Sequence, residues 1–348
     1  MSSKNIPMTS AVLVAGGAGF IGSNLVRTLL GTGKTVHCID NFSTGYDRAL
    51  AQCVQHNNFR LYKGDITDCH FMAQFRDAGY AEIYNLACPT GVPNIAKLGE
   101  EMLLASSAGS LNLLQIAKNN KSRYLFASTA EVYGDPEVFP QSETYAGNVD
   151  CVGPRSAYEE GKRFGEALTK EFARRHGVDT RIIRIFNTYG PNMWANDTRV
   201  IPHMLSRMAL GEAVTIFGDG KNTRTFLHVK DLIRGFFLSM QKPWIGDVYN
   251  IGGEVEYTMT DLFALCSEIA DYHLRPIFKP HFIEDHRRRL PDTTRIRHLG
   301  WRPRITLKTG LQQSYISILS QLQTTSRKMA SSVLPVGISA ADESHASI

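Results

Sequence analysis

The sequence predicts an α/β fold in which helices cover both faces of a parallel sheet, followed by a smaller lobe that would bind a substrate. Short runs rich in Val, Ile, Leu and aromatic residues alternate with longer stretches whose apolar residues recur at helical spacing. The first run leads into a glycine-rich turn, and the alternation ends near residue 187. Because parallel strands need a long crossover connection, usually a helix, this alternation predicts a doubly wound parallel sheet.

Six apolar runs are predicted as strands of this sheet, buried on both faces. They are 11–16, 35–40, 59–65, 82–87, 123–128 and 180–187. Between them, helical spacing of apolar residues predicts helices. These residues are Ile21, Leu25, Leu29 and Leu30 in the first helix, Leu103, Leu104, Leu111, Leu114 and Ala117 near 99–118, and Phe164, Leu168 and Phe172 near 156–175.

In the second half of the chain, loops rich in Gly, Asn and Pro interrupt the alternation of predicted strands and helices. We predict that residues 8–186 form the sheet domain and that later segments near 226–252 return to it. Residues 187–320 would form mainly the smaller lobe. The segment 322–348 is rich in Ser and Ala and lacks periodicity, so it is predicted as a mostly disordered tail.

Composition excludes several classes of protein. The 348 residues are 43% hydrophobic and 20% charged, which is ordinary for a soluble globular protein with room for two lobes. The net charge of +5 is small, and the densest basic run, 285–292, is too short to predict binding of nucleic acid. The N-terminal stretch has too few apolar residues for a signal peptide or a membrane span, so no membrane partner is expected.

The six cysteines follow no regular spacing and include no CxxC pair. This pattern argues against a disulfide framework or a zinc site and favours a reducing compartment. We therefore expect a cytoplasmic protein without a metal ion.

The glycine-rich turn has the spacing of a dinucleotide-binding loop, typical of a Rossmann-type sheet. Gly16, Gly19 and Gly22 lie between the first predicted strand and the first predicted helix. Gly16 allows the tight turn, Gly19 lets a pyrophosphate approach the backbone, and Gly22 lets the helix pack close to the sheet. The free N–H groups and the positive dipole end of that helix would bind the phosphates. A purely structural turn is the alternative.

Acidic residues follow the second and third predicted strands. Asp40 is placed to accept hydrogen bonds from the two ribose hydroxyls and to repel a 2′-phosphate, and no arginine directly follows it, so NAD is predicted rather than NADP. Asp65 and Ile66 are predicted to lie along the adenine, with an aspartate that merely stabilises a turn as the alternative.

Tyr158 and Lys162 stand four residues apart and therefore share one face of a predicted helix. The ammonium of a neighbouring lysine favours the phenolate and would lower the pKa of the tyrosine. The tyrosinate could then remove a hydroxyl proton while hydride leaves the adjacent carbon for NAD⁺. A surface Tyr–Lys pair is the alternative, but the glycine loop upstream and the hydroxyl of Thr129 at the end of a strand favour the catalytic interpretation.

Together, the three spaced glycines, Thr129 and the Tyr158-x-x-x-Lys162 pair resemble the extended short-chain dehydrogenase/reductase family, also known as NAD-dependent epimerases/dehydratases. Its members remodel sugars carried on nucleotide diphosphates, and the resemblance covers residues 10 to 320. Within the family, segments such as "EVYGDPEVFPQSE", "GPRSAYEEGKR" and "FGDGKNTRTFLHVKDL" are most similar to those of UDP-glucuronate decarboxylases, which make UDP-xylose.

The resemblance implies a role for each matching residue. The implied catalytic residues are Thr129, Glu131, Tyr158, Lys162 and Arg289. The implied NAD-binding residues are Gly16, Gly19, Phe20, Ile21, Gly22, Asp40, Asn41, Asp65, Ile66, Leu86, Ala87, Tyr158 and Lys162. The implied substrate-binding residues are Asn187, Arg199, Val200, Phe217, Arg224 and Arg289. A guanidinium suits diphosphate oxygens through paired hydrogen bonds, although Arg224 and Arg289 could also be surface arginines.

The implied chemistry is a cycle in which NAD is reduced and reoxidised within one turnover. Oxidation at C4 of the sugar turns the C6 carboxylate into a β-keto acid, which can lose CO₂. Protonation at C5 and return of the hydride then give the pentose. By the same resemblance, the helices near 99–118 and 156–175 would pair two chains in a homodimer.

Three positions depart from the decarboxylase pattern. Ala130 stands where decarboxylases have Ser and 4,6-dehydratases have an Asp that protonates the leaving hydroxyl. Ile95 stands near the position of a usual tyrosine, and Ser106 replaces a common asparagine. Ala130 disfavours dehydration, while an NDP-sugar 4-epimerase stays open as the main alternative to decarboxylation. A non-catalytic NAD sensor is disfavoured, because Tyr158 and Lys162 are both present.

Overall fold

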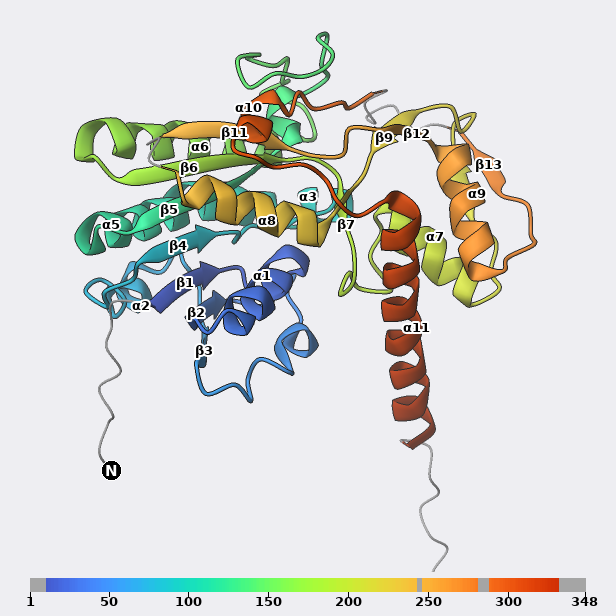
Figure 1. The fold of residues 1–348 in the computed structure, drawn as a ribbon, viewed down its shortest axis with the longest axis horizontal. Helices are drawn as coiled ribbons and strands as arrows, with labels where there is room; N and C mark the ends of the chain where they lie inside the picture. The colour runs from blue at the N-terminus through green and yellow to red at the C-terminus, as the bar shows by residue number, and fades with distance from the viewer. Residues whose placement is uncertain (1–10, 243–245, 281–287, 332–348) are drawn as a thin grey trace, which may run out of the picture.

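The computed structural model describes residues 11–242, 246–280 and 288–331, and a parallel sheet of seven strands forms its centre (Figure 1). The strand order is β11-β6-β5-β4-β1-β2-β3, and all six neighbouring pairs are parallel. The strands are β1 (Ala11–Ala15), β2 (Thr35–Asp40), β3 (Phe59–Lys63), β4 (Glu82–Asn85), β5 (Arg123–Thr129), β6 (Asp179–Ile185) and β11 (Asp247–Ile251). The six predicted strands are therefore confirmed.

The order of the strands reverses between β1 and β4, since β2 and β3 lie on one side of β1 and the later strands on the other. In open α/β sheets, ligands bind beyond the carboxyl ends of the strands at such a point. The glycine loop follows β1 and residues 86–88 follow β4. Both segments therefore lie where the fold places a ligand.

Burial on both faces was predicted for every strand, and this is wrong for β3. Only Phe59 of this strand is buried, and the remaining residues are half-buried or exposed. The reason is its place in the sheet, because β3 is an edge strand and pairs only with β2. By contrast, all five residues of β1, at the centre of the sheet, are buried.

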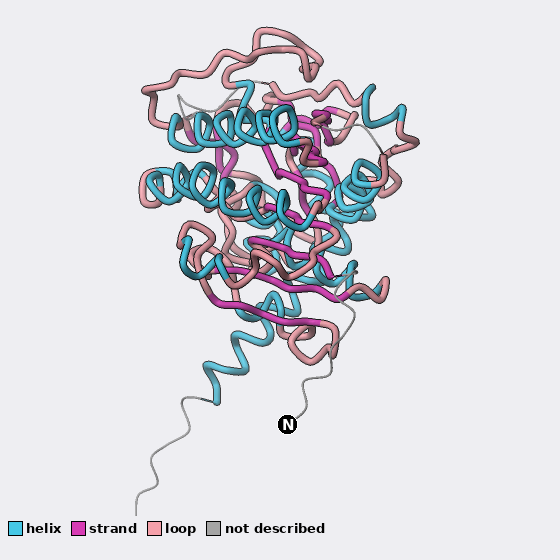
Figure 2. Tube along the Cα trace, turned by 90° about the vertical axis from the view of Figure 1, so that its left-hand side faces the viewer, coloured by secondary structure: helices cyan, strands magenta, loops and turns pink. Residues whose placement is uncertain are grey.

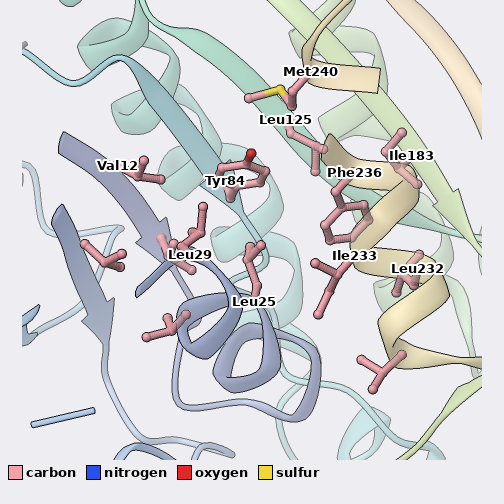
Figure 3. Close-up of a cluster of buried hydrophobic side chains, with 14 of the residues drawn as sticks. Val12, Leu25, Leu29, Tyr84, Leu125, Ile183, Leu232, Ile233, Phe236 and Met240 are labelled. Atoms are coloured by element: carbon pink, nitrogen blue, oxygen red, sulfur yellow. The ribbon is translucent and has the colours of Figure 1, made fainter. Parts of the chain in front are cut away.

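One face of the sheet is covered by α1 (Phe20–Gly31) and α8 (Val229–Met240). Leu25 and Leu29 of α1 and Phe236 of α8 are buried against this face, together with Leu125 from β5 (Figure 3). Each fully buried leucine or phenylalanine contributes about 2 kcal/mol to stability. The helix α8 and the strand β11 thus return to the sheet after the chain has passed through the second lobe.

The opposite face is covered by α5 (Ser110–Asn120) and α6 (Ser156–His176), with the short α2 (Cys69–Ala73) near the sheet edge. Figure 2 shows helices on both sides of the strands. The doubly wound α/β architecture is therefore confirmed.

The predicted helix near 99–118 is continuous but irregular. It consists of α4 (Gly99–Leu104), a π-helical turn η3 (Ala105–Gly109) and α5. Leu103 and Leu104 are each 43% exposed, and Phe164 of α6 is 53% exposed. These three side chains therefore do not face the sheet, although they follow the apolar spacing of the helices that do.

A second hydrophobic core holds the smaller lobe together. It is built by α7 (Val200–Ala209), α9 (Met259–Ala270) and α11 (Leu307–Ser331), which bury Leu205, Leu262 and Leu311. Three two-stranded ribbons, β10–β7, β12–β9 and β13–β8, lie beside these helices. The ribbon strands are β7 (Thr188–Tyr189), β8 (Thr215–Phe217), β9 (Thr223–Thr225), β10 (Leu227–His228), β12 (Glu256–Thr258) and β13 (Ile277–Lys279). The remaining short helices are η2 (Asp47–Leu50), α3 (Val92–Ile95), η4 (Ala130–Tyr133) and α10 (Thr294–His298).

The predicted disordered tail begins too early. Helix α11 extends to Ser331 and projects from the second lobe (Figure 1), so residues 322–331 are helical. No glycine or proline interrupts the sequence between Leu311 and Ser331, and Leu322 packs against the second core. Residues 332–348 lie outside the described part of the chain. Within the described part, no helix has the length and apolar character needed to cross a membrane.

Candidate active site

Two positions at the glycine loop have room only for a glycine. Gly16 has a φ of +78°, and a Cβ there would lie 2.7 Å from backbone atoms of Leu86 and Ala87. A Cβ on Gly22 would lie 2.1 Å from the carbonyl oxygen of Gly16. The loop, the first turn of α1 and the end of β4 are therefore packed backbone against backbone, which leaves the close approach that a pyrophosphate needs.

The start of α1 fits an anion. Gly19 is its N-cap, no side chain caps the helix, and the first turn contains no acidic residue. The N–H groups of Phe20 and Ile21 thus belong to a helix end with positive dipole and no side-chain acceptor. The guanidinium of Arg199 lies 5.4 Å from the centroid of the Phe20 ring and adds positive charge nearby.

Asp40 is fixed beside this loop at the end of β2. Its Oδ2 accepts a hydrogen bond from the N–H of Ala18 at 2.8 Å, and its Oδ1 accepts one from the N–H of Phe42 at 2.8 Å. Burial raises the pKa of Asp40, and these two backbone hydrogen bonds partly oppose that rise. Each carboxylate oxygen can accept further hydrogen bonds, so the side chain fits the ribose hydroxyls of a dinucleotide.

Asp65 has the structural role given above as the alternative to binding adenine, that of an aspartate that stabilises a turn. Its Oδ1 accepts hydrogen bonds from the N–H and the hydroxyl of Thr67 at 2.8 and 2.7 Å, and its Oδ2 accepts one from Asn41 at 2.7 Å. Burial opposes ionisation, but these hydrogen bonds lower the pKa of Asp65 overall. Ile66 is buried, and a Cβ on Gly109 would meet its side chain at 2.5 Å. Contact with adenine stays a prediction for both residues.

Thr129 and Tyr158 come together at the carboxyl end of β5. Thr129 is the N-cap of η4, and its hydroxyl forms a hydrogen bond with Tyr158 in the first turn of α6. Burial, and then the nearby Cys88 and Glu131, raise the pKa of the Tyr158 phenol, whereas the hydrogen bond with Thr129 and the charge of Arg199 act to lower it. The phenol thus lies among the polar groups that the sequence predicted for the site.

Lys162 follows Tyr158 by one helical turn and is buried. Its Nζ donates to the carbonyl oxygen of Ala127 at 2.9 Å and lies 5.0 Å from the centroid of the Phe126 ring. The effect of Lys162 on the pKa of Tyr158 stays a prediction. Burial of the phenol dominates and raises that pKa, while the Lys162 ammonium is bound to a backbone carbonyl.

Glu131 lies between two arginines. Arg289 binds it through two contacts, Nη1 to Oε1 at 2.7 Å and Nη2 to Oε2 at 3.0 Å. Arg155, the N-cap of α6, donates to Oε2 at 2.7 Å and also binds the buried Glu159 at 3.1 Å. The side chains of Glu131, Arg155 and Arg289 are only 11–15% exposed. This shielding strengthens the attraction between the charges, while the loss of their hydration opposes it.

Arg155 was missed by the sequence prediction. Its only signal was its position three residues before Tyr158, in a segment predicted to begin a helix. Arg289 was predicted from its motif, and the structure brings it to Glu131. Backbone hydrogen bonds of the residues that follow Arg289 explain this placement. The N–H of Gln141 donates to the carbonyl oxygen of Leu290, and the N–H of Asp292 donates to the carbonyl oxygen of Gln141.

A buried polar network supports that contact. The Nδ2 of Asn250 donates to the carbonyl oxygens of Gln141 at 2.9 Å and Asp292 at 3.2 Å. The Oδ1 of Asn250 accepts a hydrogen bond from the hydroxyl of Tyr133 at 2.7 Å. Asn250, at the end region of β11, thus ties together the segments that carry Glu131 and Arg289.

The predicted substrate residues lie on the second lobe and on the segment that leads to it. Asn187 follows β6, Val200 starts α7, Phe217 ends β8 and Arg224 lies in β9. Arg224 is buried and donates to the carbonyl oxygen of Thr223, whereas Phe217 is 38% exposed. The charge of Arg199 acts on Tyr158, and Arg199 binds Asp197 through two nitrogens.

The three departures from the decarboxylase pattern also have defined places. Ala130 is buried in an apolar cluster with Val132, Tyr133 and Phe186. Ser106 is buried in the π-helical turn, 3.9 Å from the sulfur of Cys88. Ile95 ends α3 and is half-buried. Position 130, which carries a serine in decarboxylases and an aspartate in dehydratases, thus holds a methyl group within an apolar environment.

A cavity of about 390 Å³ lies elsewhere, between α6 and the β6–β11 edge of the sheet. Arg163, Glu166, Lys170 and Arg184 line it, and none of the predicted site residues does. Arg184 binds Glu166 through two contacts of 2.9 and 2.7 Å, so much of the charge in the cavity is already paired. Among the described residues, no group of three or more His, Cys, Asp or Glu side chains could hold a metal ion.

Comparison with known proteins identifies the family. Residues 12–252 match the NAD dependent epimerase/dehydratase family. The chain is 39% identical over 301 residues to UDP-glucuronic acid decarboxylase 1 of Arabidopsis thaliana, covering 86% of this chain and 68% of that protein. It is 37% identical over 304 residues to UDP-glucuronic acid decarboxylase 1 of Danio rerio, covering 87% of this chain and 71% of that protein.

The fold is similar to that of UDP-glucose 4-epimerase from Thermotoga maritima, solved with UDP-glucose. The TM-score is 0.81 at 31% identity, with 90% of this chain and 99% of that chain covered. The glycine loop, Asp40 and the uncapped start of α1 are the features that NAD requires, and all three are present. The chain therefore belongs to the NAD dependent epimerase/dehydratase family, and NAD is its cofactor.

Proposed function

We propose that this enzyme decarboxylates UDP-glucuronate to UDP-xylose through a transient 4-keto sugar. The observation that carries the proposal is the cluster of Glu131 with Arg155 and Arg289. The Glu131 carboxylate of this cluster raises the pKa of Tyr158. Arg155 and Arg289 hold two guanidinium groups at Glu131, and a guanidinium suits a sugar that bears a carboxylate. The similarity to decarboxylases of Arabidopsis and Danio supports the same substrate.

Tyr158 would accept the proton of the sugar 4-hydroxyl, and its hydrogen bond with Thr129 would stabilise the phenolate. NAD, when bound, supplies the acceptor and later the donor of the C4 hydride. Lys162, held in the first half of α6, would bind the ribose of that cofactor. The phenol then returns its proton to the C4 oxygen in the last step. Tyr158 therefore ends the cycle in the protonation state in which it began.

The ketone at C4 makes the C6 carboxylate a β-keto acid. The C5–C6 bond then breaks, its electron pair forms the enolate across C4 and C5, and CO₂ leaves. A proton added at C5 restores the ketone before the hydride returns. Arg289 would hold the C6 carboxylate at the start, and Glu131 and Arg155 would orient its guanidinium.

The nucleotide would be bound by the second lobe. Arg199 and Arg224 carry the positive charge that a diphosphate requires, and Phe217 offers an exposed ring on which a base can stack. Asn187 and Val200 stand on the segments that lead into this lobe. Arg199 would have to leave Asp197 in part, since both Asp197 oxygens now hold its guanidinium.

Incubation of the purified protein with UDP-glucuronate and catalytic NAD⁺, followed by mass spectrometry, tests the proposal. We expect a product lighter by the mass of CO₂, with no net NADH at the end. An isobaric product would instead indicate 4-epimerisation, and a product lighter by one water would indicate dehydration. Absence of any product from several UDP-uronates and UDP-hexoses would overturn the proposal.

The 4-epimerase is the second candidate, because a 4-epimerase has the same fold over 90% of this chain. Epimerisation requires the keto sugar to turn over in the pocket, and Tyr158, Thr129 and NAD suffice for its chemistry. Arg289→Met separates the two reactions. It should abolish decarboxylation, whereas an epimerase acting on a neutral hexose would keep most of its rate.

We also propose that two chains pair through α4 and α6. Leu103, Leu104 and Phe164 form an exposed apolar surface on these two helices, which pack closely enough that a Cβ on Gly161 would lie 3.6 Å from Leu103. Large exposed apolar side chains on adjacent helices favour an interface. Light scattering of the wild type and of Phe164→Glu tests the pairing, with a dimer expected for the first and a monomer for the second.

A cytoplasmic location is proposed on chemical grounds. All six cysteines, each in the described part of the chain, are free thiols. Imaging of a tagged full-length chain in the source cells tests this, and recovery of the protein in a secreted fraction would contradict it.

A further inference from the structure

The loop that follows β2 forms one wall of the NAD site. The N–H of Tyr46 donates to the carbonyl oxygen of Ala18, in the glycine loop, at 3.2 Å. A Cβ on Gly45 would lie 2.9 Å from both the Ala18 side chain and Oδ1 of Asp40. This loop therefore rests directly on the groups that hold the dinucleotide.

A segment of the second lobe, residues 190–199, reaches the same place from the other side. Asn24 of α1 donates to the carbonyl oxygen of Pro191 at 3.1 Å and accepts from Nδ2 of Asn192 at 3.2 Å. At the far end of the segment, Arg199 lies over the ring of Phe20. The segment is thus fixed to the first half of α1, the helix whose start fits the pyrophosphate.

The two walls meet through aromatic side chains. The rings of Tyr46 and Trp194 are stacked, with centroids 4.5 Å apart and planes 14° from parallel. The guanidinium of Arg48 lies 5.5 Å from the centroid of Trp194. Stacked aromatic pairs and guanidinium–indole contacts are both attractive beyond simple burial. Tyr46 is 43% exposed, so the contact lies at the surface, where it can open without disrupting either core.

We propose that Tyr46, Arg48 and Trp194 form a clasp between the two lobes, and that opening of this clasp limits how fast NAD leaves the enzyme. Each partner of the stack belongs to a segment that contacts NAD-binding groups, so separating the rings removes the side-chain contact that joins the two walls and leaves each wall its own hydrogen bonds to Ala18 or Asn24. A clasp of this kind suits an enzyme that must keep its reduced cofactor until the hydride returns. The inference rests on the NAD site alone and does not depend on which sugar is turned over.

Exchange of bound NAD tests the clasp without any sugar substrate. The purified protein is loaded with radiolabelled NAD and chased with excess unlabelled NAD, and the label retained is followed with time. Loss of a stacked pair should speed exchange by about 3- to 10-fold in Trp194→Ala and in Tyr46→Ala. The double variant should exchange no faster than the faster single variant, because both substitutions break the same contact.

Two conservative variants serve as controls. Trp194→Phe and Tyr46→Phe keep a ring at each position and should exchange within about twofold of the wild type. Exchange that is unchanged in both alanine variants would overturn the clasp. So would alanine effects that simply multiply in the double variant, or phenylalanine variants as fast as the alanine ones. Circular dichroism of each variant confirms the fold, and the Tyr46 and Trp194 variants test the contact independently from the two lobes.

Discussion

Arg289 binds Glu131 through two contacts of 2.7 and 3.0 Å, although 158 residues of sequence separate them. The planar guanidinium matches both carboxylate oxygens at once, a geometry that an ammonium cannot reproduce. Glu131, the acidic member of this pair, also acts on Tyr158 and raises the pKa of its phenol. We propose that the substrate's carboxylate is recognised at this pair.

Replacing Arg289 by lysine should lower kcat for UDP-glucuronate by roughly 10- to 100-fold, since a charged hydrogen bond is worth about 1.5–3 kcal/mol. The neighbouring Arg288 is a matched control. It also binds a carboxylate twice, Glu256 at 2.8 and 2.6 Å, but its side chain is 43% exposed. Arg288→Lys should change kcat by less than about twofold. Equal effects of the two substitutions in steady-state assays would contradict the role given to Arg289.

The hydrogen bond between Thr129 and Tyr158 should set the pH dependence of the reaction. That bond stabilises the phenolate and so lowers the pKa of Tyr158, against the larger effect of burial, which raises it. Thr129→Val removes the bond, and the alkaline rise of kcat/KM should move upward by roughly 0.7 of a pH unit, the equivalent of a hydrogen bond worth ~1 kcal/mol. Thr129→Ser keeps the hydroxyl and should leave the profile in place. A shift to lower pH in Thr129→Val would show that the phenolate is not the active form.

Two glycines of α1 should respond in opposite ways to the same substitution. A Cβ on Gly22 would lie 2.1 Å from the carbonyl oxygen of Gly16, so Gly22→Ala should destabilise the protein by about 2 kcal/mol or more and abolish NAD binding. A Cβ on Gly31 meets no atom within 4 Å, so Gly31→Ala should stabilise the helix by about 0.5–1 kcal/mol. Thermal unfolding and NAD titration check both. Tight NAD binding by Gly22→Ala would contradict the packing argument.

His228 should make stability depend on pH in the acid range. Burial lowers the pKa of His228 to about 4, a direction that Lys230 reinforces and Asp231 opposes. The neutral ring is therefore favoured in the folded state, while the unfolded state binds its proton near pH 6.5. The stability that the neutral ring gives is present above pH 6.5 and is lost as the pH falls from there to about 4, by at most about 3 kcal/mol.

His228→Asn separates this effect from a change of packing. Asparagine can still accept from the N–H of Lys230 as the N-cap of α8, but it does not titrate. Urea unfolding at several pH values between 4 and 7 should give a flatter dependence in the variant, whatever its absolute stability. The same slope in both proteins would exclude His228 as the source.

The sequence was sufficient to predict the structure where that structure depends on a local pattern of residues. Apolar runs and glycine spacing predicted the strands around the NAD site, because burial and backbone geometry there depend on neighbouring residues. The sequence was insufficient to predict contacts between segments that lie far apart in the chain. Arg155 carries no signal of its own pairing with Glu131, and the stack of Tyr46 on Trp194 joins two loops of different lobes. The spacing of Tyr158 and Lys162 predicted their shared face but not the balance of burial and charge that raises the pKa of the phenol.

The position of Arg289 along the chain also bears on how the enzyme is made. On the ribosome, the seven strands of the sheet have all been synthesised once Ile251 is in place, and with them the glycine loop and Asp40. Arg289 follows later, and its neighbours Leu290 and Asp292 form hydrogen bonds with Gln141 and Asn250, which precede it in the chain. N-terminal parts of a chain generally fold first during synthesis. A chain that ends before Arg289 would therefore carry the seven strands, the glycine loop and Asp40, but it would lack both the arginine proposed to bind a uronate and Ile296, Leu299 and Trp301 of the core on one face of the sheet.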